Sequence, residues 1–540
     1  MLARSASDAA ANLVVGTATR YLVLALNIGL GIVLMPFTVA HLGQTEYGLW
    51  MLAASMTTYF QLLDLGYGNG VVRHLVEADR RGDVADVNRI ASTFVCVYAG
   101  IAVVACAAIA VMIVAVVPRF PHLSPAQVRV AQALLAILGA RVAIGFPLTV
   151  FGAVTNARQG FALNNLVASA TVVASAACTY LVLESGGGLL ALVATTTAVN
   201  LLGYAGYAWT AYRMMPELRI RPSYFNASRW REVTSFSLFL FAINLAGQIS
   251  FNLDNIVVGA FLGPAAVAVY TIALRLGEYQ RRLCDQFSGM LFPVVVGFGA
   301  DGDRGALQRT LVEGNRIALA LVAGVSVCLV GFSGPLIFRW MGPAFEGSVA
   351  PFDVLALAGT IVVSQAASSN VLIAVGRHRV VTWIWTVEAF VNLGLSVLLV
   401  HRMGLLGVAI GTLVPLVVGH LVVMLNAACR AVGISVARCV FEAARPAAIA
   451  GTTAACAGAA VRIAWPPASA AAVVGEMGLV ALVYVASLAT VGFDRETRRV
   501  YASEVRRAGA ALVSAIAPAG GRRATTADPD RPISPSVSLP

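Results

Sequence analysis

The sequence lacks lysine: all 37 basic side chains among its 540 residues are arginine. In a P-loop nucleotide-binding site a lysine reaches the β- and γ-phosphates, so a chain without lysine cannot build that site. The chain therefore cannot itself be a P-loop ATPase. We attribute the absence to GC-rich codon usage rather than to selection at each position.

Charge is also scarce, since charged residues make up 12% of the chain, hydrophobic residues 59%, and the mean hydropathy is +0.82. A soluble domain carries about 25% charged residues. The composition therefore excludes a soluble globular protein and predicts a polytopic membrane protein. The net charge of +11 does not indicate nucleic-acid binding, because the arginines lie in short loops between apolar runs, as the positive-inside rule describes.

Cysteine and histidine are few and scattered. None of the eight cysteines stands in a CxxC pair, and no two of the six histidines lie at metal-ligand spacing. We interpret the cysteines as small hydrophobic residues. The sequence therefore predicts no disulfide, no metal site and no cofactor, and it offers no catalytic residue.

Long apolar runs are what the chain has in abundance. The first, at 13–42, is too long for the apolar part of a cleaved signal peptide. Taking about 20 residues for each crossing, we count fourteen membrane-spanning helices, with an error of about two. The fold class is therefore an all-α polytopic membrane protein. The predicted spans lie at 13–42, 47–70, 90–117, 128–155, 161–183, 188–212, 233–262, 264–297, 311–333, 350–374, 380–400, 404–427, 445–463 and 470–492.

The chain divides into five predicted regions. The last region, the tail, is rich in Pro, Ser and Thr from about residue 518 and is predicted to be disordered there. The regions are an N-terminal six-helix bundle at 1–212, a cytoplasmic linker at 213–231, a C-terminal six-helix bundle at 232–430, an additional helix pair at 431–493 and a cytoplasmic tail at 494–540.

The arginines are distributed unevenly between the two sides of the membrane. With these spans, one set of alternate loops and both ends of the chain hold 27 arginines, whereas the opposite loops hold 5. The positive-inside rule then places both termini in the cytoplasm.

An internal repeat supports two equivalent halves. Shifting the chain by 220 residues brings ten identities in fifty into register without a gap, including Gly43 with Gly263, Tyr59 with Tyr279 and the two copies of Gly-Asp at 82–83 and 302–303. Each half has an even number of spans, so both copies point the same way through the membrane, as in transporters whose paired bundles rock around a central cavity.

The span at 264–297 is apolar apart from five charges, four of which share one face of the helix, while the fifth, Arg281, falls near the edge of that face. Arg275, Glu278, Arg282 and Asp285 fall within one helical stripe roughly 80° wide, with Tyr279 on its border. A charge facing lipid costs at least about 2.5–3.5 kcal/mol, so the stripe must face protein or water. It marks a predicted translocation path.

Further ionisable residues lie inside other spans, and for several a structural role stays open. Arg20 and Asp64 are close enough to the cytoplasmic interface to snorkel or to pair there. Asp254 is equally a candidate structural partner of Arg275. By depth, Arg141 and Arg275 fall near the midplane, Arg20 and Asp64 in the cytoplasmic part of spans 1 and 2, Asp254 in an outer half and Glu388 in an inner half.

The first hairpin carries a family resemblance. The stretches His41-Leu-Gly-Gln-Thr-Glu-Tyr-Gly-Leu-Trp50 and Leu63-Asp-Leu-Gly-Tyr-Gly-Asn-Gly-Val-Val-Arg73 resemble the N-terminal signature of polysaccharide biosynthesis membrane proteins. These are the Wzx-like oligosaccharide flippases of the multidrug/oligosaccharidyl-lipid/polysaccharide exporter superfamily. The stretch Leu253-Asp-Asn-Ile-Val-Val-Gly-Ala-Phe-Leu-Gly-Pro264 is similar to the family's second copy of that hairpin. The resemblance covers residues 10–430.

The resemblance implies two six-helix bundles around a V-shaped lumen. It also implies export of an undecaprenyl-diphosphate-linked oligosaccharide across the bacterial inner membrane, with membrane lipids and the polysaccharide polymerase or export machinery as partners. The related lipid II flippases keep cavity arginines in their first and eighth spans, where this chain has Arg20 and Arg275.

The residues themselves agree with an anionic cargo. A guanidinium offers a diphosphate a bidentate partner that is always charged, which suits Arg20, Arg141, Arg275 and Arg282. Acids in the spans would balance this charge in the empty lumen, and a buried acid could couple cargo movement to protons. We assign that coupling or charge-balancing role to Asp64, Asp254, Glu278, Asp285 and Glu388.

Two other functions are compatible with parts of the sequence. A cation-coupled multidrug antiporter of the same superfamily would share the fold, but a cationic drug calls for an acidic or aromatic lumen rather than arginines at the midplane. A membrane-embedded polysaccharide polymerase or ligase would need a large outer loop, and the longest outer loop predicted here, near 334–349, is short. The protein is therefore predicted to be a transporter and not an enzyme.

Overall fold

The computed structural model describes residues 2–234, 253–300, 303–467 and 469–492, and every regular element in these ranges is helical. The prediction of an all-α membrane protein is confirmed. The first half contains α1 (Leu2–Thr58), η1 (Tyr59–Asp64), α2 (Tyr67–Arg80), α3 (Val84–Val111), η2 (Met112–Val116), η3 (Val117–Arg119), α4 (Pro125–Ala157), α5 (Phe161–Glu184), α6 (Leu189–Met214) and η4 (Pro222–Tyr224). The second half contains α8 (Asp254–Leu262), α9 (Pro264–Ala300), α10 (Arg304–Gly331), α11 (Ser333–Met341), η5 (Pro343–Ser348), α12 (Val349–Ser364), α13 (Ala366–Ala374), α14 (His378–Leu416), η6 (Val417–Met424), α15 (Leu425–Val432), α16 (Val436–Ala464), α17 (Ala470–Ser487) and η7 (Leu488–Gly492).

Ten helical segments of the described chain are long and apolar enough to cross a membrane. Two of them, 19–64 and 378–432, contain a glycine with non-helical backbone angles, so each is a pair of helices. At Gly404 this pair is antiparallel, because a Cβ added at Gly411 would lie 2.4 Å from Ser396 Oγ across the turn. The protein is thus a multi-pass membrane protein, and the number of fourteen spans stays a prediction.

The internal repeat is visible in the backbone. Gly43 (φ 77°, ψ 165°) and Gly263 (φ 85°, ψ 175°) adopt the same conformation, which only glycine enters readily, so both hairpins turn alike. Asp83 and Asp303 each cap the next long helix, accepting a hydrogen bond from the amide three residues on at 2.8 and 2.9 Å. All four residues obey the 220-residue shift read from the sequence.

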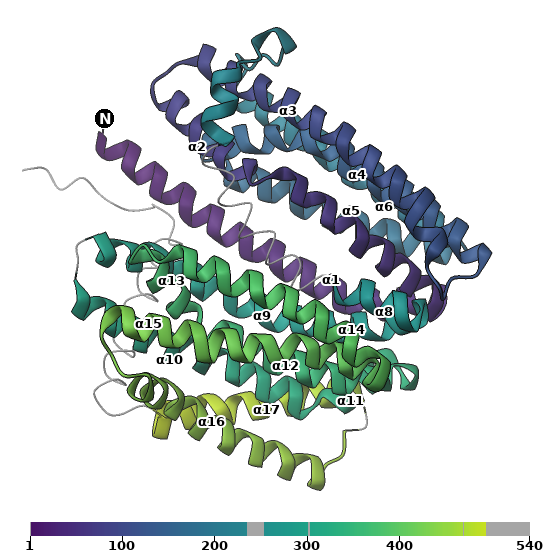
Figure 1. Ribbon diagram of the computed structural model, residues 1–540, viewed down its shortest axis with the longest axis vertical. Helices are drawn as coiled ribbons and strands as arrows, with labels where there is room; N and C mark the ends of the chain where they lie inside the picture. Colours follow the sequence, from purple (N-terminus) through teal and green to yellow (C-terminus); the bar gives the residue numbers. More distant parts are fainter. Residues whose placement is uncertain (1, 235–252, 301–302, 468, 493–540) are drawn as a thin grey trace, which may run out of the picture.

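The helices form two groups, α2–α6 and α8–α17, and the long helix α1 runs along the space between them (Figure 1). At one end of the molecule α1 is attached to the second group. There Trp340 Nε1 donates to the carbonyl of Ile32 at 2.7 Å, and Gly48 packs so close to Pro264 that a Cβ would lie 1.7 Å from the proline carbonyl oxygen. From this end the groups diverge, which gives the molecule its V shape (Figure 1).

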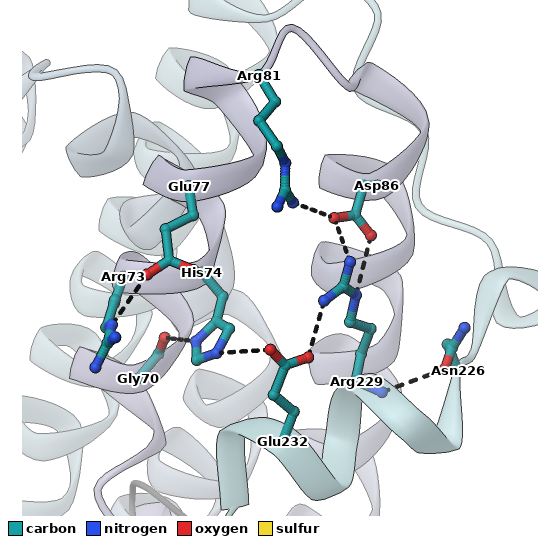
Figure 2. Close-up of polar contacts among 9 residues, drawn as sticks. All are labelled: Gly70, Arg73, His74, Glu77, Arg81, Asp86, Asn226, Arg229 and Glu232. Atoms are coloured by element: carbon teal, nitrogen blue, oxygen red, sulfur yellow. Dashed lines mark hydrogen bonds and ion pairs between the residues drawn. The ribbon is translucent and has the colours of Figure 1, made fainter.

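Charged side chains fasten the linker between the halves to the first group of helices (Figure 2). Asp86, whose side chain is 2% exposed, accepts from Arg81 at 2.9 Å and from Arg229 at 2.7 and 3.1 Å. Arg229 also donates to Glu232 at 2.8 Å, and Glu232 lies 3.7 Å from His74 Nε2. The hydrogen bond to Glu232, and then the charge of Asp86, raise the pKa of Arg229 above its ordinary value. Arg229 therefore stays charged at the centre of this network.

Polar side chains of α3 hold the extended part of the linker. Asn88 Nδ2 donates to the Glu217 carbonyl at 3.1 Å, and Asn88 Oδ1 accepts from the Arg219 amide at 2.9 Å. Ser92 Oγ likewise donates to the Arg219 carbonyl at 3.3 Å and accepts from the Arg221 amide at 3.1 Å. Side chains thus replace the hydrogen bonds that a neighbouring strand would supply, so this part of the linker is fixed to the first group.

Candidate functional site

The charged stripe of α9 forms one connected cluster. Arg275 Nη1 donates to Glu278 Oε2 at 2.9 Å, and Arg282 Nη2 lies 2.5 Å from Glu278 Oε1, so a single carboxylate joins two guanidinium groups. The spacings of three and four residues place these side chains on one face of the helix, as expected from the sequence. The side chains of Arg275 and Arg282 are 43% and 49% exposed, so both guanidinium groups remain accessible to a ligand.

The cluster keeps most of its hydrogen-bonding capacity. A guanidinium has five N–H donors, and within the described residues Arg275 and Arg282 each use one of their terminal nitrogens on Glu278. The three side chains carry a net charge of one positive unit. The cluster can therefore accept a doubly coordinated anion without giving up its internal ion pairs. The side chain of Asp285, the fourth predicted member of the stripe, lies outside the described residues.

Asp254 does not serve as the partner of Arg275. It is 1% exposed, and its Oδ2 accepts from the Tyr270 hydroxyl at 2.8 Å and from Thr412 Oγ1 at 3.1 Å. Its Oδ1 has no hydrogen-bond partner among the described residues. The alternative left open by the sequence is thereby settled: Arg275 pairs with Glu278, and Asp254 belongs to a separate polar site between α8, α9 and α14.

A cavity of about 730 Å³ with several polar lining residues lies within the first group of helices. Two residues predicted from the sequence, Arg20 of α1 and Asp64 of η1, share it although they are far apart along the chain. The opposite charges of Arg20 and Asp64 can balance each other across the cavity without direct contact. Its polar lining consists of Arg20, Asp64, Tyr98, Thr149, Asn156, Asn164, Asn165, Tyr204 and Tyr207.

Asp64 stands at a break in the second helix of the hairpin. The sequence predicts a continuous span to about residue 70, but the helix ends in a 3₁₀ turn and Leu65 and Gly66 both have positive φ, 52° and 74°. A left-handed leucine is strained, and such strain concentrates at functional sites. The break lets Asp64 accept from the Tyr98 hydroxyl and from the Gly68 amide at 3.3 Å.

Arg141 remains apart from these groups. It lies half-exposed on α4 and, in the part of the chain that the structure describes, no ion pair or hydrogen bond links it to another side chain. The structure thus brings Arg275, Arg282 and Glu278 together, brings Arg20 and Asp64 to one cavity, and leaves Arg141 on its own helix.

Glu388 has a partner that the sequence did not suggest. Its Oε1 lies 2.8 Å from His420 Nδ1, and both residues are buried, at 5% and 4% exposure. Gly419 makes room for this contact, because a Cβ there would lie 1.7 Å from Glu388 Oε1. A signal did exist: Glu388 and His420 lie sixteen residues on either side of the turn at Gly404, so an antiparallel hairpin must bring them level.

Comparison with known proteins places this fold. The model of the family "Polysaccharide biosynthesis protein" matches residues 13–296, just over half of the chain. A curated relative, the uncharacterized membrane protein EpsK of Bacillus subtilis (strain 168), is 23% identical over 362 residues, which cover 63% of this chain and 67% of the relative.

Two solved structures share the architecture. The lipid II flippase MurJ in an inward closed conformation superposes with a TM-score of 0.68 over 88% of this chain and 98% of its own, at 14% identity. An inward-facing multidrug resistance MATE family transporter of the MOP superfamily gives a TM-score of 0.64 over 75% of this chain and 95% of its own, also at 14% identity.

The structure is that of a multi-pass membrane protein with the fold shared by the lipid II flippase MurJ and the MATE family transporter. The chain belongs to the polysaccharide biosynthesis protein family.

Proposed function

We propose that this protein is a flippase that moves a polyprenyl-diphosphate-linked oligosaccharide across the bacterial inner membrane, for assembly of exopolysaccharide, O-antigen or capsule. The observation that carries the proposal is the α9 cluster, in which Arg275 and Arg282 share one acid and keep donors for an anion. A diphosphate loses water on entering the membrane, and a bidentate guanidinium replaces part of that hydration.

Each predicted site residue takes a part in this proposal. Arg20 meets the head group in the cavity of the first bundle, and Arg275 with Arg282 hold it deeper in the lumen, with Arg141 as a further guanidinium. Glu278 balances the α9 arginines when no cargo is bound. Asp64 balances Arg20, and Asp254, Asp285 and Glu388 are the proposed coupling acids. An ion gradient or the cargo's own gradient supplies the free energy, because the chain has no lysine for a P-loop.

The arginine distribution supports cytoplasmic termini and an inner-membrane location. Membrane lipids surround the protein, and the polymerase or export machinery is the proposed partner that takes the cargo from the outer face.

A cation-coupled multidrug antiporter is the second candidate, because the likeness to the MATE transporter fits it equally at the level of the fold. The arginines of α9 favour the flippase, since a cationic drug would be repelled by them. A polymerase or ligase is a third candidate that no observation favours.

Binding and efflux measurements separate the first two. We expect the purified protein in lipid nanodiscs to bind a polyprenyl diphosphate carrying a neutral disaccharide, and cells that overproduce it to extrude cationic dyes no faster than control cells. Dye efflux together with no binding of the lipid would reverse the order of the two candidates.

A further inference from the structure

A second cavity, of about 300 Å³, lies between α1, α5 and α6 of the first bundle. Its lining contains no charged residue, although five of its ten members are polar. Uncharged polar residues at membrane depth also occur where helices merely pack together. Here, however, they line a space large enough for a ligand group, so packing alone does not explain them. The polar members are Asn27, Thr171, Ser175, Thr179 and Asn200.

The hydrogen bonds of these lining side chains use their donors and leave their oxygens able to accept. Asn27 Nδ2 donates to the Val23 carbonyl at 2.8 Å, and Asn200 Nδ2 donates to the Thr196 carbonyl at 2.7 Å. Thr171 likewise donates its hydroxyl proton to a carbonyl of its own helix at 2.8 Å. Within the described residues the side-chain oxygens of all three remain able to accept. A ligand that suits such a wall is neutral and rich in O–H donors.

The second cavity lies further along two of the helices that line the first. Both cavities are lined by α1 and α5, the charged one through Arg20 and Asn165 and the uncharged one through Asn27 and Ser175. At 1.5 Å per residue, the two cavities lie about 10–15 Å apart along these helices. That separation matches a diphosphate followed by one or two sugar rings.

Glycine keeps the cavity next to the stripe of α9. Gly31, which lines the cavity, faces the Tyr279 hydroxyl so closely that a Cβ would lie 2.3 Å from that oxygen. Tyr279 borders the cluster of Arg275 and Glu278 on the same helix. The uncharged cavity thus lies beside the α9 stripe and about 10–15 Å along α1 from Arg20.

We propose that this cavity is a subsite for the uncharged, hydroxyl-bearing sugar units nearest the diphosphate. The inference rests on the proposed flippase function and deepens it, because the arginines would select the diphosphate and this subsite the neutral sugar. A cargo with a carboxylated or phosphorylated sugar at this position would leave its charge without a partner here.

The test compares two probes on the full chain in nanodiscs: a polyprenyl diphosphate bearing a neutral disaccharide, and the same polyprenyl diphosphate without sugar. Asn27→Leu and Asn200→Leu each remove an acceptor, and Ala176→Leu fills the cavity from α5. Each should weaken binding of the glycosylated probe about tenfold, the loss expected for one or two hydrogen bonds, and change binding of the bare lipid less than twofold. The control is Ala177→Leu, which adds the same bulk to an exposed position of α5 outside the lining.

The outcomes separate the two proposals. Equal weakening of both probes by the cavity variants, or no change in either, would overturn the sugar subsite while leaving the flippase proposal in place. Failure of the unmodified protein to bind either probe would overturn the flippase proposal and the subsite with it. Because the bare lipid reports on each variant separately, a variant that does not fold is recognised by its loss of both ligands, and the other two then decide.

Discussion

The two halves of the chain share a backbone plan and differ in where they place charge. Both begin with a hairpin turned by glycine, Gly43 or Gly263, and both cap the next helix with aspartate, Asp83 or Asp303. After the turn, however, the second half continues as the unbroken helix α9 with its arginine cluster, whereas the first half breaks at Leu65.

The positions that correspond under the 220-residue shift show the same contrast in composition. Arg275 corresponds to Ser55, and Arg282 corresponds to Leu62. The first half instead places its acid, Asp64, in a cavity that Arg20 also lines. The two copies thus share the residues that set helix direction and differ at charged positions, so the second bundle carries the α9 arginine cluster and the first a polar cavity.

The largest effect that we expect is a loss of stability at the linker, where the two halves differ. Asp86 corresponds to Ala306, and only Asp86 holds arginines. Asp86→Ala should lower the free energy of unfolding by about 2–4 kcal/mol, because it removes the buried partner of two guanidinium groups that are themselves partly exposed. The control is Asp303→Ala, which removes only a helix cap and should cost about 1 kcal/mol. Unfolding in detergent measures both, and equal losses would contradict the role given to the linker network.

The next prediction compares a buried acid, Asp254, with an acid that lines a cavity, Asp64. Asp254→Leu should cost about 2–3 kcal/mol, since the Tyr270 and Thr412 hydroxyls lose a buried acceptor. Asp64→Leu should cost less than about 1 kcal/mol, because water in the cavity replaces it, yet it should impair transport. Thermal unfolding and polymer export, measured on both variants, test this pair. A larger loss of stability for Asp64→Leu than for Asp254→Leu would contradict the placement of Asp254 in a buried site and of Asp64 in a cavity.

A smaller loss of stability, equal in the two halves, is expected at the two glycine turns. Gly43→Ala and Gly263→Ala each force alanine into positive φ, which costs about 1–2 kcal/mol whatever the surroundings. An added Cβ meets nothing within 4 Å at Gly43, and at Gly263 it meets His122 Cβ at 3.4 Å and the His122 carbonyl oxygen at 3.9 Å. The two unfolding free energies should therefore fall by similar amounts, and a difference above about 1 kcal/mol would show that the turns are not equivalent.

The last comparison concerns the two sides of the membrane. Its two cysteine substitutions should leave activity unchanged. In a variant without the eight native cysteines, Ser185→Cys should react with an impermeant thiol reagent from outside the cell, and Arg304→Cys should not. Both positions are exposed, so access depends on the side of the membrane. The reverse pattern of labelling would invert the predicted orientation.

Sequence alone predicted what depends on local spacing. The stripe of α9 follows from helical periodicity, and the equivalence of Gly43 and Gly263 follows from the repeat. The pair of Glu388 and His420 was missed, because it depends on how two helices are rotated about their axes. The break after Asp64 was missed as well, because a leucine gives no sign that it adopts positive φ.

The cavities and the linker network lie further beyond sequence reasoning. The uncharged cavity joins residues of α1, α5 and α6 that no spacing rule connects, and Asp86 meets Arg229 across 143 residues. Such contacts are decided by the packing of whole helices rather than by local pattern.

The central claim is that the arginine cluster of α9 binds the diphosphate, and Arg275 tests it most directly. In a strain that carries only the variant, Arg275→Lys should retain partial export because it keeps the charge and loses the bidentate fork. Arg275→Gln should reduce export of surface polymer at least tenfold, the loss expected for hydrogen bonds to a charged group, with normal abundance of the protein in the membrane. The double variant Arg275→Gln with Glu278→Gln removes the ion pair together with its partner, and we predict that it stays inactive. Full export by the single Arg275→Gln variant, or recovery of export in the double variant, would contradict the claim.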